Sequence, residues 1–199
     1  MCRDMNIESL EAMNFQDVLH RAKFEGELRP EEVEAAADAL RKEEWGESDP
    51  YDLLYIVGLG GMKKHRPILE RVLDSPDDPM LARAALIQLC RYFDEFDRYR
   101  DVVIQFIEGV QWDWLGAVRH QAIRLAGQHL AEHEDIELLR LLFEIYLDPN
   151  DNRRETAYKA LEQAVSDDFW DEFGGVDEPG PDSERAQRLW RKLRERFEE

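Results

Sequence analysis

Apolar residues recur at intervals of three and four along most of the chain, which is the spacing of one face of an α-helix. No segment of useful length alternates apolar and polar residues as a half-buried strand would. The pattern therefore predicts an all-α protein. The expected helices are Phe15–Glu25, Pro30–Trp45, Tyr51–Gly60, His65–Leu73, Pro79–Phe93, Arg98–Val110, Leu115–Ala131, Ile136–Leu147, Arg153–Val165 and a last helix from Ser183 to Glu199.

The first two helices are marked by local start and stop signals. Asn14 can cap the first helix and Gly26 can end it, whereas Pro30 opens the second helix and Gly46 follows its end. We expect these helices to form an N-terminal helical unit over residues 1–48.

A repeating pattern begins at Asp49. A helix of small residues is followed by a short acidic turn, a bulkier helix and a turn with Asp and Pro, and the unit recurs about every 35 to 37 residues. Small side chains such as Ala82 and Ala122 let neighbouring helices approach closely enough to stack. The sequence therefore predicts a helical solenoid of about four helix pairs over residues 49–173.

One segment of this region, Val118-Arg119-x-x-Ala122-x-x-Leu125-Ala126-Gly127, resembles the first helix of a HEAT repeat. Two further segments are similar, Arg154-x-x-Ala157-x-x-Ala160-Leu161 and Leu81-x-x-x-Ala85-x-x-x-Leu89. The resemblance covers roughly Asp49 to Val165. It implies a HEAT-like α-solenoid in which the second helix of each pair lines the inner, concave face.

The C-terminal part changes character. Residues 166–182 hold seven acids and no base, and glycines and prolines interrupt residues 174–182, which we interpret as an acidic linker. Ser183 then caps an amphipathic helix, residues 183–199, with an apolar stripe that includes Trp190. We favour a cap on the last repeat, since solenoid ends need covering. The alternative is a helix offered to a partner.

Charge narrows the possible functions. The 199 residues include 45 acids and 26 Lys and Arg, for a net charge of -19, and the pI is near 4.7. This balance excludes a protein that holds duplex nucleic acid by phosphate contacts.

The longest apolar run, residues 53–62, is far shorter than the roughly 20 residues that span a bilayer, and the N-terminus lacks a secretory signal pattern. We expect a cytoplasmic protein with no membrane contact.

The segment from His129 to His133 is the most suggestive catalytic motif. Histidines four apart share a helix face, and the order His-x-x-Glu-His resembles the inverzincin metalloprotease signature. A third ligand must complete such a site, however, and a histidine near a helix C-terminus is also favoured by the helix dipole. We therefore assign no metal ligand.

Other catalytic patterns are missing from the sequence. Gly58-Leu59-Gly60-Gly61 lacks the Lys and Ser/Thr of a phosphate-binding loop, and no nucleophile elbow is found. Cys90 lies in an apolar helix with no general base beside it, as expected of a core residue. We predict a non-enzymatic protein without a cofactor.

Acidic residues cluster at equivalent places in the repeats. Equivalent turns of a solenoid lie along one edge, so the turn acids would form an acidic ridge beside the polar positions of the second helices. Such a surface would steer a basic partner. The turn acids are Asp94, Glu95, Asp97, Glu132, Glu134, Asp135, Asp167, Asp168, Asp171 and Glu172; the second-helix positions are Glu70, Asp74, Asp101, Gln105, Glu108, Glu137, Arg140 and Glu144. The alternative is that these charges only keep the surface solvated.

Trp112, Asp113 and Trp114 lie in a turn beside this acidic surface. Tryptophans in such a place can be the aromatic anchors that dominate interfaces. They can equally be buried between repeats. The sequence leaves both interpretations open for each ring.

Size, charge and the expected fold together resemble small acidic immunity proteins of bacterial toxin systems, including contact-dependent growth inhibition. That resemblance implies a basic partner, a nuclease-type toxin domain, bound by a monomer in a heterodimeric complex. A general HEAT-repeat scaffold is the main alternative. The third interpretation is an enzyme, either a zinc hydrolase using His129 and His133 or a HEAT-type lyase acting on a bound chromophore.

Overall fold

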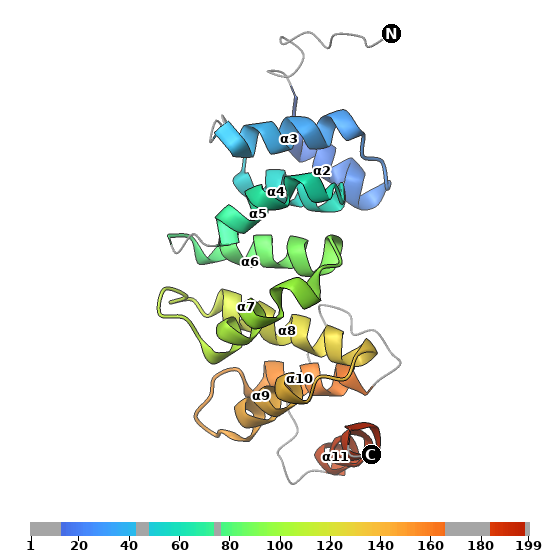
Figure 1. The fold of residues 1–199 in the computed structure, drawn as a ribbon, viewed down its shortest axis with the longest axis vertical. Coiled ribbons are helices and arrows are strands. Elements are labelled where there is room, and N and C mark those ends of the chain that lie inside the picture. The colour runs from blue at the N-terminus through green and yellow to red at the C-terminus, as the bar shows by residue number, and fades with distance from the viewer. Residues whose placement is uncertain (1–12, 43–47, 74–76, 166–183, 198–199) are drawn as a thin grey trace. The chain divides into compact units, whose positions relative to one another are not determined.

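The computed structural model describes residues 13–42, 48–73, 77–165 and 184–197. Within these residues every regular element is a helix and no strand is found, which confirms the all-α prediction (Figure 1). The α-helices are α2 (Phe15–Phe24), α3 (Pro30–Lys42), α4 (Pro50–Leu59), α5 (Arg66–Leu73), α6 (Pro79–Ile87), α7 (Phe96–Glu108), α8 (Ala117–Glu132), α9 (Ile136–Leu147), α10 (Arg154–Ala164) and α11 (Glu184–Phe197).

The chain divides into two compact units, Met1–Glu95 and Phe96–Glu199, called unit 1 and unit 2 below. Unit 1 holds α2 to α6 and unit 2 holds α7 to α11. The boundary predicted between residues 48 and 49 lies inside unit 1, where α2 and α3 both pack against α4. The predicted linker, residues 174–182, lies outside the described residues.

Short polar side chains fix where several helices begin. Asn14, Asp49, Asp78 and Asp135 each accept a hydrogen bond from a backbone N–H of the first turn that follows. Such N-caps satisfy donors that the helix leaves unpaired, typically stabilising it by about 1 kcal/mol. Proline follows Asp49 and Asp78 at the first helical position, where its missing N–H costs nothing. The Asp-Pro turns are therefore helix starts.

A buried carboxylate joins α2 to α3 in unit 1. Glu32 is 4% exposed and accepts hydrogen bonds from Arg21 at 2.6 Å and from the backbone N–H of Arg29 at 3.0 Å. Burial opposes its charge, but the bonds from Arg29 and Arg21 hold the pKa of Glu32 below its usual value. The described helices of the predicted N-terminal unit are thus tied together by charge as well as by packing.

The predicted single helix Pro79–Phe93 has two parts. The α-helix α6 ends at Ile87, and a π-helical turn, η2 (Gln88–Tyr92), follows and closes with a bond from Phe93 N–H to the carbonyl of Gln88. Gln88 is fully buried beside Gly58 of α4, and a Cβ on that glycine would lie 1.8 Å from Gln88 Oε1. Glycine at this position makes room for the polar side chain.

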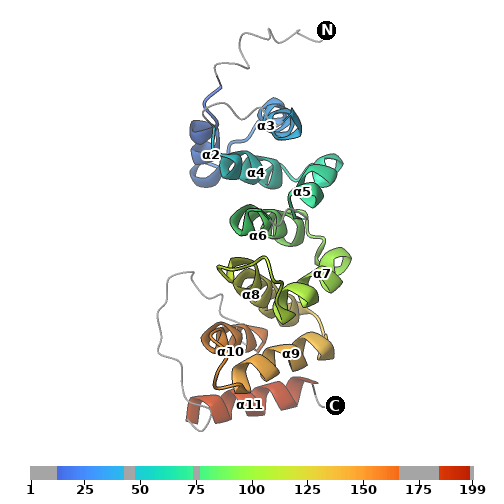
Figure 2. The same cartoon turned by 90° about the vertical axis from the view of Figure 1, so that its left-hand side faces the viewer.

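In unit 2, α8 and α10 lie side by side in one layer, and α7 and α9 lie in the other (Figure 2). The first layer is packed so closely that a Cβ on Gly127 would lie 2.7 Å from the Cα and Cβ of Ala160. Gly127 and Ala160 are buried, as expected from the small-residue pattern that resembles a HEAT repeat.

The C-terminal helix α11 packs on α10 and reaches α9, where the rings of Trp190 and Phe143 stack with centroids 4.3 Å apart. Leu189 and Leu193 of α11 are buried. In the part of the chain that the structure describes, no helix has the length and hydropathy needed to cross a membrane.

Candidate partner-binding surface

The outward side of α7 and α9 carries the polar residues that the helical period places there. Their side chains are exposed, and Asp101 reaches 97% exposure. The opposite side of α7 is buried through residues such as Val103 and Phe106. We define the acidic face as the exposed positions Asp101, Gln105, Glu108, Glu137, Arg140 and Glu144.

Glu95, predicted as a ridge acid, is instead an internal partner of unit 1. Arg66 donates two hydrogen bonds to its carboxylate, both at 2.7 Å, and Lys63 lies 3.4 Å away. The side chain is only 11% exposed. Burial favours the neutral acid, yet the bonds from Arg66 and Lys63 hold the pKa of Glu95 below its usual value. Its charge is used within the fold.

Asp135 has a similar structural role in unit 2. It caps α9 through the N–H of Leu138, and Arg100 donates to both of its oxygens, at 2.5 and 2.9 Å. The bond from Arg100 lowers the pKa of Asp135 and outweighs the opposing effect of burial. The same guanidinium bonds Glu137 at 2.7 Å, so part of the charge of the acidic face is neutralised at this end.

The other predicted acids differ in exposure. The turn acids Asp94, Asp97, Glu132 and Glu134 are exposed, and Glu70, a predicted second-helix position, is half-buried in unit 1. Asp94 also has a left-handed backbone (φ 53°), a conformation that aspartate tolerates better than most residues and that ends the helical segment before it. The acids at positions 74, 167, 168, 171 and 172 lie outside the described residues.

The two tryptophans before α8 differ in burial. Trp112 is half-buried and packs edge-to-face on Phe106, with ring centroids 5.8 Å apart. Trp114 is 76% exposed, and the neighbouring Leu115 is 47% exposed. Trp112 therefore contributes to packing, whereas Trp114 presents a large apolar surface to solvent.

The loop that carries Trp114 is fixed by hydrogen bonds. Asp113 accepts from the N–H groups of Ala117 and Arg119, each at 2.9 Å. Arg153 donates to the carbonyl oxygens of Leu115 and Gly116, at 3.1 and 2.9 Å. A side chain at Gly116 would clash with that guanidinium, and its φ of +63° also favours glycine. Trp114 is thus exposed on a preorganised loop.

A second arginine ties this region to the start of α10. Arg119 donates to both oxygens of Asp151, at 3.1 and 2.6 Å, and to the carbonyl of Ile107 at 2.8 Å. Asp151 also accepts from the N–H of Arg153. Arg119, Asp151 and Arg153 were not predicted as supports of the loop, although Asp151 and Arg153 follow Arg119 at a spacing of roughly one repeat, which was a signal in the sequence.

His129 and His133 belong to a stack of three rings. The ring centroids of Phe96 and His129 lie 4.1 Å apart, and those of His129 and His133 lie 4.4 Å apart. The ring planes are nearly parallel in both pairs. Burial is the main cause that lowers the pKa of His129, and the neighbouring His133 lowers it further. Among the residues that the structure describes, no group of three His, Cys, Asp or Glu side chains is arranged to hold a metal ion.

Cys90 is 5% exposed in η2, and burial raises the pKa of its thiol to about 12. The thiolate that acts as a nucleophile or metal ligand is therefore strongly disfavoured at neutral pH. Its environment is that of a small core residue.

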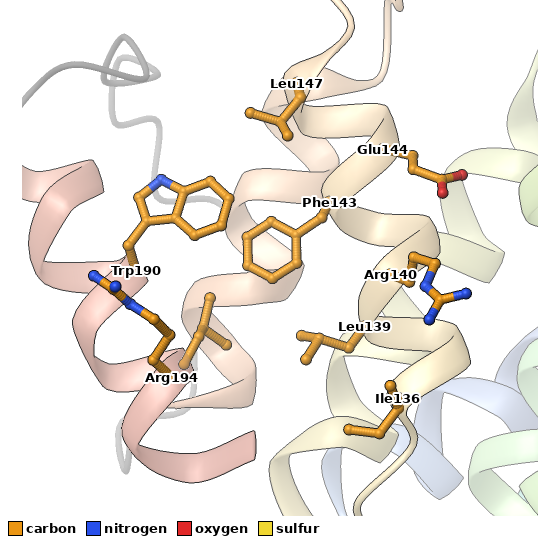
Figure 3. Close-up of a pocket in the computed structure, with 9 residues that line it drawn as sticks. Ile136, Leu139, Arg140, Phe143, Glu144, Leu147, Trp190 and Arg194 are labelled. Atoms are coloured by element: carbon orange, nitrogen blue, oxygen red, sulfur yellow. The ribbon is translucent and has the colours of Figure 1, made fainter. Parts of the chain in front are cut away.

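Two residues of the acidic face also border a groove. Figure 3 shows this groove between α9 and α11, with the stacked rings of Phe143 and Trp190 in it and Arg140 and Glu144 at one side. Its volume is about 570 Å³. The sequence indicated the apolar stripe of α11, but only the packing of α11 on α9 shows that an open apolar groove is left.

No protein-family model matches the chain, and comparisons with curated proteins and with solved structures give no match either.

Proposed function

We propose that this protein is a non-enzymatic, HEAT-like helical-repeat module that binds a basic protein through the acidic face of unit 2. The observation that carries the proposal is the exposed Trp114 on its fixed loop, in the same unit as exposed acids of α7 and α9. An interface needs apolar anchors for affinity, and charge complementarity supplies association rate and specificity.

A repeat architecture is supported by contacts at about one repeat length. Arg100 reaches Asp135 and Arg119 reaches Asp151, pairs that are 35 and 32 residues apart. The close approach of Gly127 to Ala160 falls at a similar spacing. Contacts that recur at such a period are expected where each helix pair stacks on the next.

The preorganised loop favours tight binding. A partner that buries Trp114 does not have to order the loop first, because Asp113 and Arg153 already hold it. Preorganisation reduces the entropy lost on association. An indole that is 76% exposed also offers apolar area that a partner could cover.

The chemistry of the surface fits an immunity protein that neutralises a nuclease-type toxin in the cytoplasm. Nucleases bind a polyanion, so their active surfaces are basic. An acidic binder can occupy such a surface or block access to it. A general scaffold would use the same repeats but bind many basic partners weakly.

A capture experiment tests the proposal. The immobilised protein is exposed to native cytosol at low and moderate salt, and retained proteins are identified by mass spectrometry. One basic protein retained at both salts, and lost when Trp114→Ala replaces the wild type, supports a specific interface. The capture of many different basic proteins that all dissociate at moderate salt contradicts the proposal, because such binding depends on charge alone.

A further inference from the structure

The groove between α9 and α11 has features that the acidic face does not explain. It lies wholly within unit 2 and has a volume of about 570 Å³. Pockets that take small molecules usually measure about 300 to 1,000 Å³ and are mostly apolar. The groove therefore has the size and lining of a ligand site.

The floor of the groove is an apolar stripe along α9. Ile136, Leu139, Phe143 and Leu147 follow one another at intervals of three or four, which places them on one face of the helix. From first to last they span about 16 Å at the α-helical rise. Trp190 and Leu193 of α11 form the other wall. The rings of Trp190 and Phe143 meet between the two helices (Figure 3).

The two ends of this stripe remain open to solvent. Ile136 is 50% exposed and Leu147 is 52% exposed, whereas Leu139 between them is buried. Phe143 is covered in part by its stack on Trp190. An apolar ligand lying along α9 would remove this surface from water at a gain of about 25 cal/mol per Å².

Two arginines at the groove differ from most arginines of this strongly acidic protein. Among the described residues, neither Arg140 nor Arg194 has an ion-pair or hydrogen-bond partner. Arg66, Arg100 and Arg119, by contrast, each bind carboxylates through two or more hydrogen bonds. These two guanidiniums are thus the positive charges that the described lining offers to a ligand.

Arg194 is better placed than Arg140 to hold an anion. Glu144 lies one turn from Arg140 on the same side of α9, and its charge would repel a carboxylate there (Figure 3). Arg194 lies beside Trp190 on the α11 side, and it is the one charged residue that α11 contributes to the described lining. A guanidinium can bind a carboxylate through two parallel hydrogen bonds.

We infer that this groove binds a small amphiphilic carboxylate, with its hydrocarbon chain along the Ile136–Leu147 stripe and its carboxylate on Arg194. The ligand class follows from an elongated apolar floor and from a guanidinium at its edge that has no carboxylate partner among the described residues. The inference does not depend on the proposed function, because the groove would bind an anionic ligand, whereas the acidic face would bind a basic protein.

Calorimetric titration of the full chain with dodecanoate, below its micelle concentration, tests the site. We expect saturable binding with a dissociation constant of about 0.1 mM or lower. Dodecyltrimethylammonium, which has the same chain and the opposite charge, should bind at least tenfold more weakly, roughly 1.4 kcal/mol. Absence of saturable dodecanoate binding, or equal binding of both amphiphiles, would overturn the inference.

Variants locate the two ends of the ligand. Arg194→Gln should weaken dodecanoate about tenfold, whereas Arg191→Gln, an exposed arginine of α11 that does not line the groove, should leave the affinity unchanged. Leu147→Ser should weaken the chain contact, and its exposed position lets the fold tolerate the change. Equal affinities of the two arginine variants would refute the assigned anchor.

Discussion

Asp135 and Asp101 both lie on the surface of unit 2, yet their side chains are 9% and 97% exposed. Asp135 caps a helix and binds Arg100 with both oxygens, whereas Asp101 approaches the same guanidinium only at 3.5 Å. Acidic residues of equal formal charge therefore divide into those that hold the fold and those that a partner can use. Charge count alone does not separate them.

The largest expected effect comes from removing a structural acid. Asp135→Ala deletes a helix cap and two charged hydrogen bonds, and of the acidic partners of Arg100 among the described residues it leaves Glu137 and Asp101. We expect the free energy of unfolding to fall by about 2 to 3 kcal/mol. Denaturant titration measures it, with Asp101→Ala as the matched control, which should change stability by less than about 0.5 kcal/mol. Similar losses for both variants would contradict the division.

The two tryptophans extend the comparison to apolar residues. Trp114→Ala should cost about 2 kcal/mol or more of partner binding and leave the melting temperature unchanged, because the ring is already in solvent. Trp112→Ala should instead lower the melting temperature, since its contact with Phe106 is lost. A Trp114 variant that loses stability, or that binds as the wild type does, would remove the proposed anchor.

Acid titration should show whether the pair of Asp135 and Arg100 contributes to stability. The folded-state pKa of Asp135 is lowered by Arg100, so its contribution is complete above the ordinary aspartate pKa near 4 and is lost as the pH falls through the lowered value. The wild type should therefore lose stability below about pH 4. Asp135→Asn should lose less stability over this range. Parallel curves for the two proteins would show that the Arg100 pair is not linked to folding.

The smallest effect on stability is expected at the acidic face. Replacing Glu108 or Glu144 by glutamine changes an exposed side chain that has no ion pair among the described residues. Each variant should unfold within about 0.5 kcal/mol of the wild type. If denaturant titration showed that the free energy of unfolding falls by more than about 1 kcal/mol, that residue would belong to the acids that hold the fold and not to those that a partner can use.

Helix type and position could be predicted from sequence because they depend on local signals. The Asn14 cap, the Asp-Pro starts and the helix Ile136–Leu147 all follow from residues close in sequence. The polar side of α7 followed from the helical period, since Asp101 and Glu108 lie opposite buried residues. These predictions needed no knowledge of tertiary contacts.

Predictions that depended on distant partners were less complete. The sequence could not show that Glu95 binds Arg66 or that Asp135 binds Arg100, because each arginine is about one repeat away. It also left both tryptophans undecided, since burial of Trp112 depends on packing against α7. The π-helical turn at Gln88 was missed because its apolar pattern continues that of α6.

The most direct test of the central claim is the association rate of the captured basic partner. The variant Asp101→Lys, Glu108→Lys, Glu144→Lys reverses three charges of the acidic face. Glu25→Lys, Glu27→Lys, Asp77→Lys makes the same change in net charge at exposed positions of unit 1. We predict that the first variant associates at least tenfold more slowly at low salt and loses most of its salt dependence, whereas the second changes much less. Equal slowing by both variants would show that net charge, and not the acidic face of unit 2, attracts the partner.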